Sequence, residues 1–163
     1  MFRLRQSQHT NLDLLLSSTL YDQDIFYSAF LDDLSKAKQE VIIESPFITS
    51  RRMSIFMPTF RKLARRGVRI IVNTKPLYEH EPDYYVQAER AITELQDLGV
   101  LVLFTVGHHR KLAIIDKCIT WEGSLNILSQ NDSCEFMRRI FSEQLASQLF
   151  AFLHLEKFMG DIQ

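Results

Sequence analysis

The apolar positions of this chain recur at two spacings, which predict alternating helices and strands. Helical spacing of three or four residues is found in the segments 22–38, 53–64 and 83–98. Short apolar runs typical of buried strands lie between and after them, namely EVIIESPF from Glu40, VRIIVNT from Val68 and VLVLFT from Val100. A glycine separates helix from strand at Gly67 and again at Gly99, which is typical of helices that connect parallel strands.

Two of the expected helices have well-defined apolar faces. The face of the first comprises Phe26, Phe30, Leu34 and Ala37. The face of the second comprises Met53, Phe56, Phe60, Leu63 and Ala64. Proline lacks a backbone N–H and crowds the preceding turn of a helix. Because Pro58 lies within the second pattern, we expect this helix either to kink there or to start near Ser54.

The pattern changes after Gly107. The segments RKLAIID (110–116) and CITWEGS (118–124) are short apolar runs about one turn apart, which predicts an antiparallel hairpin. CEFMRRIF (134–141) is a further strand candidate. The last helix has a broad apolar arc, so we expect it to be deeply buried or to meet a partner. This arc comprises Leu145, Leu149, Phe150, Phe152, Leu153 and Phe158.

The order of these elements predicts an α/β fold, an α/β/α sandwich around a mixed β-sheet. Because βαβ crossovers are right-handed, we expect helices on both faces of the sheet. We assign residues 21–163 to this single domain. Residues 1–20 are a weakly patterned lead-in, interpreted as an artificial boundary, a linker, or an edge strand around LDLLL.

Charge and cysteine content narrow the class of protein. The chain has 163 residues and a net charge of −1, so binding to a polyanion must use a local basic patch. Candidate patches are Arg51–Arg52 and the cluster 61–66, although basic residues at a helix C-terminus also suit its macrodipole. Cys118 and Cys134 lack metal-ligand spacing, and we expect reduced, buried thiols. With no signal peptide and no membrane-spanning run, a cytoplasmic location is expected.

Candidate chemistry is concentrated in GHHRKLAIID, which contains two adjacent histidines. If residues 109–116 are extended, His109 and Lys111 point to one side, and His108 and Asp116 to the other. An imidazole can attack phosphorus, and a neighbouring ammonium group can neutralise the oxygens as charge builds. This favours His109 as the reactive histidine, with Lys111 as its partner and Asp116 as a structural support.

A second polar group follows in GSLN. Gly123 allows close backbone approach, while Ser124 and Asn126 can each hydrogen-bond a phosphate oxygen. Glu135, on the next strand candidate, could accept a hydrogen bond from the second imidazole nitrogen of His109 and so fix its tautomer.

Together these residues resemble the phospholipase D superfamily, whose motif is H-x-K-x4-D followed by G-S-x-N. The matching positions are His109, Lys111, Asp116, Gly123, Ser124 and Asn126. The resemblance implies phosphodiester cleavage through a phosphohistidine intermediate, without metal or cofactor, and a second motif whose histidine protonates the leaving group. It implies that Lys111 and Asn126 bind phosphate and that Glu135 orients His109. Since this chain has one motif, it corresponds to one half-unit, and we expect a homodimer.

Four further residues are candidates for substrate binding. Ser45 and Lys75 follow predicted strands, and ligands of parallel α/β sheets bind at the carboxyl ends of strands. Arg138 follows Glu135 closely, and His108 is either a packed loop histidine or a substrate contact. His80, in a turn-rich loop between two prolines, is expected to be exposed to solvent.

The leading interpretation is a metal-independent nuclease that cleaves DNA or RNA as a homodimer. Small members with a single motif are mainly bacterial endonucleases, whereas two-motif members include lipid-cleaving enzymes. One alternative is therefore a phospholipase or phosphatidyltransferase, which would need an apolar channel or an interfacial face. The other is a non-catalytic nucleic-acid-binding module of a larger helicase-like protein.

Overall fold

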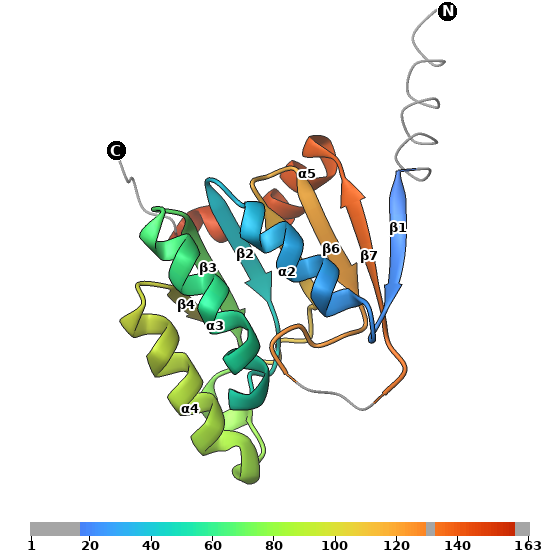
Figure 1. Ribbon diagram of the computed structural model, residues 1–163. Helices are drawn as coiled ribbons and strands as arrows, with labels where there is room; N and C mark the ends of the chain where they lie inside the picture. Colours follow the sequence, from blue (N-terminus) through green and yellow to red (C-terminus); the bar gives the residue numbers. More distant parts are fainter. Residues whose placement is uncertain (1–16, 130–132, 159–163) are drawn as a thin grey trace, which may run out of the picture.

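The computed structural model describes residues 17–129 and 133–158, which form a mixed seven-stranded β-sheet covered by helices (Figure 1). The strands are β1 (Ser18–Asp22), β2 (Glu40–Glu44), β3 (Arg69–Thr74), β4 (Leu101–Phe104), β5 (Leu112–Ile115), β6 (Ile119–Gly123) and β7 (Phe136–Phe141). The helices are α2 (Phe26–Lys36), α3 (Ser50–Arg65), α4 (Pro82–Asp97) and α5 (Glu143–Leu153), with 3₁₀ turns η1 (Leu77–Glu79) and η2 (Leu155–Phe158).

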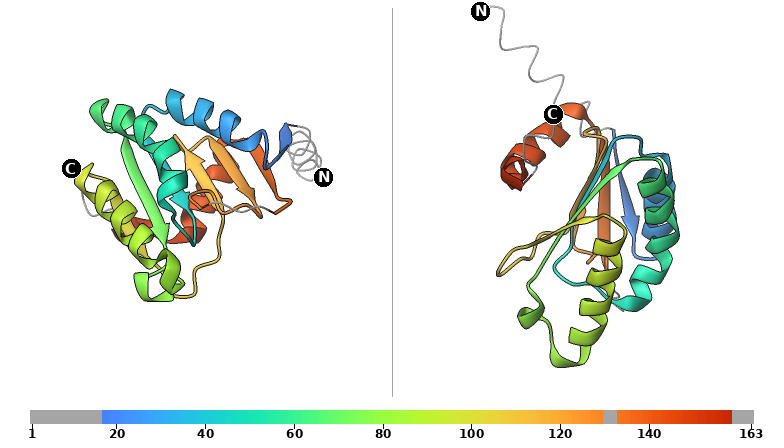
Figure 2. Two further views of the ribbon diagram at one scale, coloured as in Figure 1. Left: turned by 60° about the horizontal axis from the view of Figure 1, so that its bottom comes forward. Right: turned by 90° about the vertical axis from the view of Figure 1, so that its left-hand side faces the viewer.

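The sheet runs in the order β1-β7-β6-β5-β2-β3-β4. Strands β2, β3 and β4 are parallel neighbours, and the remaining pairings are antiparallel. The predicted mixed sheet and α/β/α sandwich are therefore confirmed. The two crossovers advance in one direction, so α3 and α4 lie on one face together with α2, while α5 covers the other face (Figure 2). The second helical layer thus comes from α5 and not from a crossover.

The main core lies between the sheet and helices α2, α3 and α4. Phe26 and Phe30 of α2 are fully buried and pack against Trp121 of β6. Asp33 is also buried; its carboxylate accepts hydrogen bonds from Trp121 Nε1 at 2.9 Å and from Arg139 Nε at 2.7 Å. Because a buried carboxylate needs such partners, this contact fixes α2 against β6 and β7.

Helix α3 begins at Ser50 and continues through Pro58, so a start near Ser54 is wrong. Thr49 caps the helix, and its Oγ1 accepts a hydrogen bond from the Arg52 N–H at 3.4 Å. Pro58 lies on the exposed side of the helix, where water can satisfy the carbonyl that loses its N–H partner.

The predicted hairpin is formed by β5 and β6 and turns at two residues with positive φ, Asp116 (50°) and Lys117 (55°). The Asp116 carboxylate accepts three hydrogen bonds from backbone N–H groups at the start of β2. The donors are Lys38 (2.8 Å), Gln39 (2.8 Å) and Glu40 (3.0 Å). Asp116 therefore attaches the hairpin to the centre of the sheet.

Three expectations differ from the structure. Helix α5 is not deeply buried, since Phe152 is 67% exposed and Ala146 and Leu153 are its buried residues. The thiols differ from the expected buried pair, because Cys118 is half-buried and Cys134 is exposed. An edge strand is present, but it is β1, which pairs with β7 and starts before residue 21. The LDLLL segment lies outside the described residues.

Candidate active site

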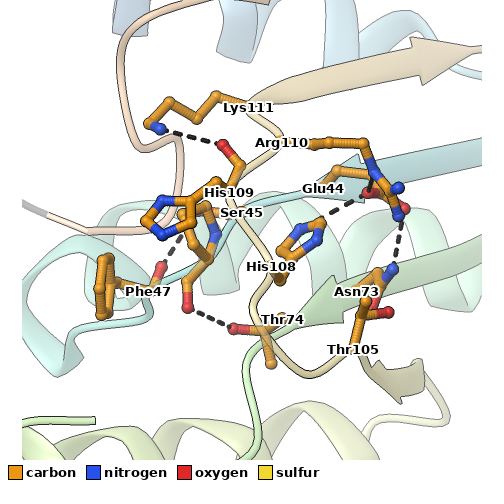
Figure 3. Close-up of polar contacts among 11 residues, drawn as sticks. Glu44, Ser45, Phe47, Asn73, Thr74, Thr105, His108, His109, Arg110 and Lys111 are labelled. Carbon is orange, nitrogen blue, oxygen red and sulfur yellow. Dashed lines mark hydrogen bonds and ion pairs between the residues drawn. The ribbon is translucent and has the colours of Figure 1, made fainter. Parts of the chain in front are cut away.

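The two adjacent histidines lie in the loop between β4 and β5 and have opposite environments. His108 is 2% exposed, whereas His109 is exposed to solvent. Figure 3 shows their rings projecting in different directions. The strand β5 covers only Leu112–Ile115, so His109 lies in the loop before it, where His108 is buried and His109 is exposed, as the expected alternation has it. The orientation of His109 therefore also needs a cause outside β5.

That cause is Glu44, a fully buried carboxylate at the carboxyl end of β2. Its Oε2 accepts a hydrogen bond from Arg110 Nε at 2.5 Å and lies 3.5 Å from His108 Nε2 (Figure 3). Its Oε1 accepts a hydrogen bond from Asn73 Nδ2 at 2.9 Å. Both neighbours of His109 are thus held inward by one carboxylate, and His109 is left to project outward.

Burial lowers the pKa of His108, and the nearby charge of Glu44 only partly opposes this. The side chain is almost completely removed from solvent, and its Nε2 lies near Glu44 but has no hydrogen-bond partner among the described residues. The His108 side chain therefore packs inside the loop, which agrees with the interpretation of His108 as a packed loop histidine.

The same loop is anchored a second time at Gly107. The backbone N–H of Gly107 donates to both carboxylate oxygens of Glu79, at 3.1 and 3.0 Å. Lys75 Nζ lies 3.8 Å from Glu79 and 4.9 Å from the ring centroid of Phe47. Lys75, a predicted substrate contact, is thereby placed between the loop anchor and Phe47.

The side chain of Lys111 contacts the backbone of His109. Its Nζ donates a hydrogen bond to the backbone carbonyl of His109 at 3.0 Å (Figure 3). This places the ammonium group beside the backbone of His109, within the segment that the motif identifies.

The second half of the motif is fixed against β7. The Ser124 N–H donates to the carbonyl of Phe136 at 3.0 Å, and Ser124 Oγ accepts from the Phe136 N–H at 3.2 Å. At Gly123 a Cβ atom would overlap the Phe136 carbonyl and the backbone of Met137, so only glycine fits. Gly123 and Ser124 therefore shape the loop that leads to Asn126.

Ser45 joins the motif loop to the end of β2. Its Oγ accepts a hydrogen bond from the Leu128 N–H at 3.0 Å and donates to the Phe47 carbonyl at 3.0 Å. The Thr49 N–H also donates to the Leu128 carbonyl, at 2.9 Å. Ser45 is fully buried and its hydroxyl is engaged within the protein; its substrate contact stays a prediction.

A pocket of about 300 Å³ lies beside these loops. It is lined by Phe47, Ile48, Thr49, His80, Glu81, Tyr84, Asn126 and Ser129. Asn126 is 9% exposed, and its Oδ1 has no hydrogen-bond partner among the described residues. His80 is 6% exposed, so the expectation of a solvent-exposed histidine is wrong. Its ring packs edge-on against Phe47, which follows β2 and lies far from His80 in sequence.

The remaining candidates lie around β7. Glu135 Oε1 accepts a hydrogen bond from Ser133 Oγ at 2.7 Å. Glu135 also acts on the nearby Tyr27. Burial raises the pKa of Tyr27 to about 12; Arg52 opposes this increase, and the charge of Glu135 adds to it. The hydrogen bond between Glu135 and His109 stays a prediction. Arg138 lies within β7, opposite Leu20 and Glu122, and its substrate contact also stays a prediction.

Two further features concern metals and membranes. Among residues 17–129 and 133–158, no group of three or more His, Cys, Asp or Glu side chains is arranged to hold a metal ion. In the same part of the chain, every helix is too short or too polar to cross a lipid bilayer.

Comparisons with known proteins place this chain in a family. The family model of the cardiolipin synthase, phospholipase D-like domain matches residues 30–154. Among solved structures, Nuc of Salmonella typhimurium, a phospholipase D family member, has a TM-score of 0.70 and 15% identity. The alignment covers 83% of this chain and 90% of Nuc. NucT of Helicobacter pylori has a TM-score of 0.68 and 18% identity, with coverage of 83% and 91%.

Phosphatidylserine synthase of Haemophilus influenzae has a TM-score of 0.60 and 13% identity. That alignment covers 82% of this chain and 37% of the synthase. No protein of curated function matches the chain. The family match spans most of the sheet and both parts of the motif, from α2 to the end of α5. This chain therefore belongs to the phospholipase D-like family.

Proposed function

We propose that the chain is a metal-independent phosphodiesterase that cleaves nucleic acid in a homodimeric active site. The observation that carries this proposal is the exposed imidazole of His109, whose two neighbours are held inward by Glu44. A nucleophile must be accessible and well oriented; the exposure of His109 and the contacts that hold the neighbouring residues of its loop support this role. Membership of the phospholipase D-like family supports the same chemistry.

The proposed reaction has two steps. In the first, a nitrogen of His109 attacks phosphorus, a P–N bond forms, and the P–O bond to the leaving alkoxide breaks. His109 of a second copy of the chain donates the proton that the alkoxide takes up. In the second step, that histidine accepts a proton from water as the water oxygen bonds to phosphorus and the P–N bond breaks. Lys111 and Asn126 stabilise the negative charge on the phosphoryl oxygens.

Glu135 is proposed to hold the second nitrogen of His109 and so to fix the reactive tautomer. Arg138 and Lys75 are proposed to contact flanking phosphates. The choice of nucleic acid rests on the likeness to Nuc and NucT over nearly their full length, whereas the synthase is matched over 37% of its chain.

A lipid substrate is the second candidate. The observations that favour it are the cardiolipin synthase description of the family model and the likeness to phosphatidylserine synthase. A lipid-directed enzyme would need an apolar entrance for acyl chains. The pocket beside Asn126 is instead lined by several polar side chains, including His80, Glu81 and Tyr84.

The test compares substrates under conditions that exclude metal. Purified protein is incubated with single-stranded DNA, double-stranded DNA, RNA and phosphatidylcholine vesicles in excess EDTA, beside His109→Ala. We expect cleavage of a nucleic acid that the substitution abolishes. Cleavage of phosphatidylcholine alone would favour the lipid alternative. Binding of DNA without turnover, unchanged in His109→Ala, would favour a non-catalytic module, as in a helicase-associated protein.

A further inference from the structure

Two residues that line the pocket next to the motif have three buried polar atoms without hydrogen-bond partners among the described residues. They are the two ring nitrogens of His80 and Oδ1 of Asn126. The backbone of Lys75 approaches the imidazole, but neither nitrogen makes a hydrogen bond of normal geometry within the described residues. Leaving such atoms unpaired costs free energy, so they identify what an occupant must supply.

The unpaired atoms define the chemistry of that occupant. Burial lowers the pKa of His80, with the backbone of Lys75 partly opposing this, so the imidazole is neutral at neutral pH. A neutral imidazole has one N–H donor and one lone-pair acceptor. The occupant must therefore offer both an acceptor and a donor. Phosphate offers acceptors alone, and the carboxylate of Glu81 at the pocket would repel it. An acyl chain would offer neither.

The aromatic lining and the volume of the pocket also suit an occupant with a flat ring. Phe47 and Tyr84 are aromatic walls, and His80 packs edge-on against Phe47. A pocket of about 300 Å³ is at the lower end of the range for small-molecule sites, which suits one flat ring system. Aromatic walls with a few hydrogen-bonding groups are typical of sites that stack a single unpaired base.

The pocket shares one residue with the motif. Asn126 lines the pocket and is also the motif residue expected to bind the scissile phosphate. Its side-chain amide has a donor end and an acceptor end, so it can contact a phosphate and a neighbouring ring together. In Figure 3 the ring of His109 projects toward the side of Phe47, past Ser45.

From these observations we propose that the pocket is a nucleobase subsite, which takes the base adjacent to the scissile phosphate. This inference rests on the proposed phosphodiesterase function and narrows its substrate to strands with an unpaired base. His80 and Asn126 hydrogen-bond the edge of the base, while Phe47 and Tyr84 contact its faces.

The test is a binding experiment with the non-cleaving His109→Ala protein. One ligand is a short single-stranded oligonucleotide, and the matched ligand is an abasic oligomer with the same number of phosphates. We expect the base-containing strand to bind about tenfold more tightly, as a single stacked base does elsewhere. His80→Phe keeps the ring and removes both nitrogens, and it should abolish most of this preference.

Two further variants separate binding from misfolding. Tyr84→Ala changes a partly exposed pocket residue and should also reduce the preference for bases. Tyr78→Ala changes a tyrosine on η1 that is 73% exposed and does not line the pocket, so the preference should be unchanged. Circular dichroism checks that each variant keeps its secondary structure.

The outcomes distinguish this inference from the proposed function. Equal affinity for the base-containing and abasic oligomers would overturn the subsite, even if the active protein cleaves DNA. A base preference lost in His80→Phe would support it, even if no cleavage is found. Binding of dihexanoyl phosphatidylcholine that His80→Phe weakens, with no preference for bases, would overturn it in favour of a lipid headgroup.

Discussion

His108 and His109 show how much a single position changes the role of a residue. The gap to Lys111 identified His109 from the sequence alone. The structure supplies the physical reason, since Glu44 pairs with His108 and Arg110 and leaves the imidazole between them exposed. Glu44 precedes this loop by more than sixty residues, and no local pattern connects them. Sequence reasoning therefore singled out His109 as the candidate, but it gave no sign of Glu44, the residue proposed to position it.

Glu44→Gln tests that positioning role. Glutamine keeps the size of the side chain but removes the charge that holds His108 and Arg110, so His109 should lose its fixed orientation. We expect kcat for oligonucleotide cleavage to fall by about ten- to a hundredfold, with little change in KM. Glu40→Gln is the matched control, because Glu40 is a buried carboxylate at the other end of the same strand. An equal loss of kcat in both variants would mean that Glu44 acts only on stability.

The buried histidines also predict how stability depends on pH. Burial lowers the pKa of His80 and His108 below the value of about 6.5 that an unfolded chain has. Below that pH the unfolded state therefore takes up protons that the folded state does not, and the free energy of unfolding decreases as pH falls. Urea unfolding between pH 7.5 and 5 measures this decrease. His80→Phe should show a weaker pH dependence; an unchanged dependence would contradict the assignment to His80.

At the scale of elements, the hairpin β5–β6 links the two parts of the motif. Lys111 immediately precedes β5, and Ser124 immediately follows β6. The turn at Asp116 sets the register of the hairpin against β2 through three backbone hydrogen bonds. The motif spacing thus has a structural meaning, because the stretch between Lys111 and Ser124 is one strand, one tight turn and one strand.

Asp116→Ala should destabilise the protein by about 3 kcal/mol, since it leaves backbone N–H groups without their charged acceptor. Alanine is also less tolerant than aspartate of the positive φ at this position. Asp116→Asn keeps one acceptor oxygen and tolerates that φ, so it should cost clearly less. Equilibrium unfolding in urea compares the two variants. Equal stability of Asp116→Ala and the unsubstituted protein would show that these hydrogen bonds contribute nothing.

Helices and strands with regular apolar spacing were predictable from the sequence. Three other features were predicted wrongly, and each has a physical reason. Pro58 does not delay α3, because it lies on an exposed side where its missing N–H costs little. The burial of His80 depends on Phe47, which is distant in sequence and follows a different strand. Helix α5 has enough apolar residues for deep burial, yet Phe152 remains exposed because, in the described part of the chain, no other α-helix lies beside α5 on its face of the sheet.

At the scale of the whole molecule, the parallel strands end where the candidate site lies. Glu44 ends β2, Asn73 lies near the end of β3, and the histidine loop follows β4. This is the edge at which ligands bind in parallel α/β sheets. The chain contributes one motif to this edge, so a complete site of the proposed kind needs a second copy.

Light scattering should therefore show a dimer at micromolar concentration, and a monomer would contradict the shared site. A mixing experiment tests the sharing itself. Unsubstituted chains and His109→Ala chains are unfolded together in equal amounts and refolded. If both copies of His109 are needed, activity should be about one quarter of that of unsubstituted protein at the same total concentration. A value of one half would show that each chain acts alone.

The covalent intermediate on His109 is the central claim, and it can be observed directly. The protein is mixed with an oligonucleotide, quenched in alkali, digested and analysed by mass spectrometry for a strand fragment joined through its phosphorus to the peptide that contains both histidines. We predict an alkali-stable, acid-labile adduct on His109 that is absent from His109→Ala. An adduct on His108, or full cleavage by His109→Ala in EDTA, would contradict the account.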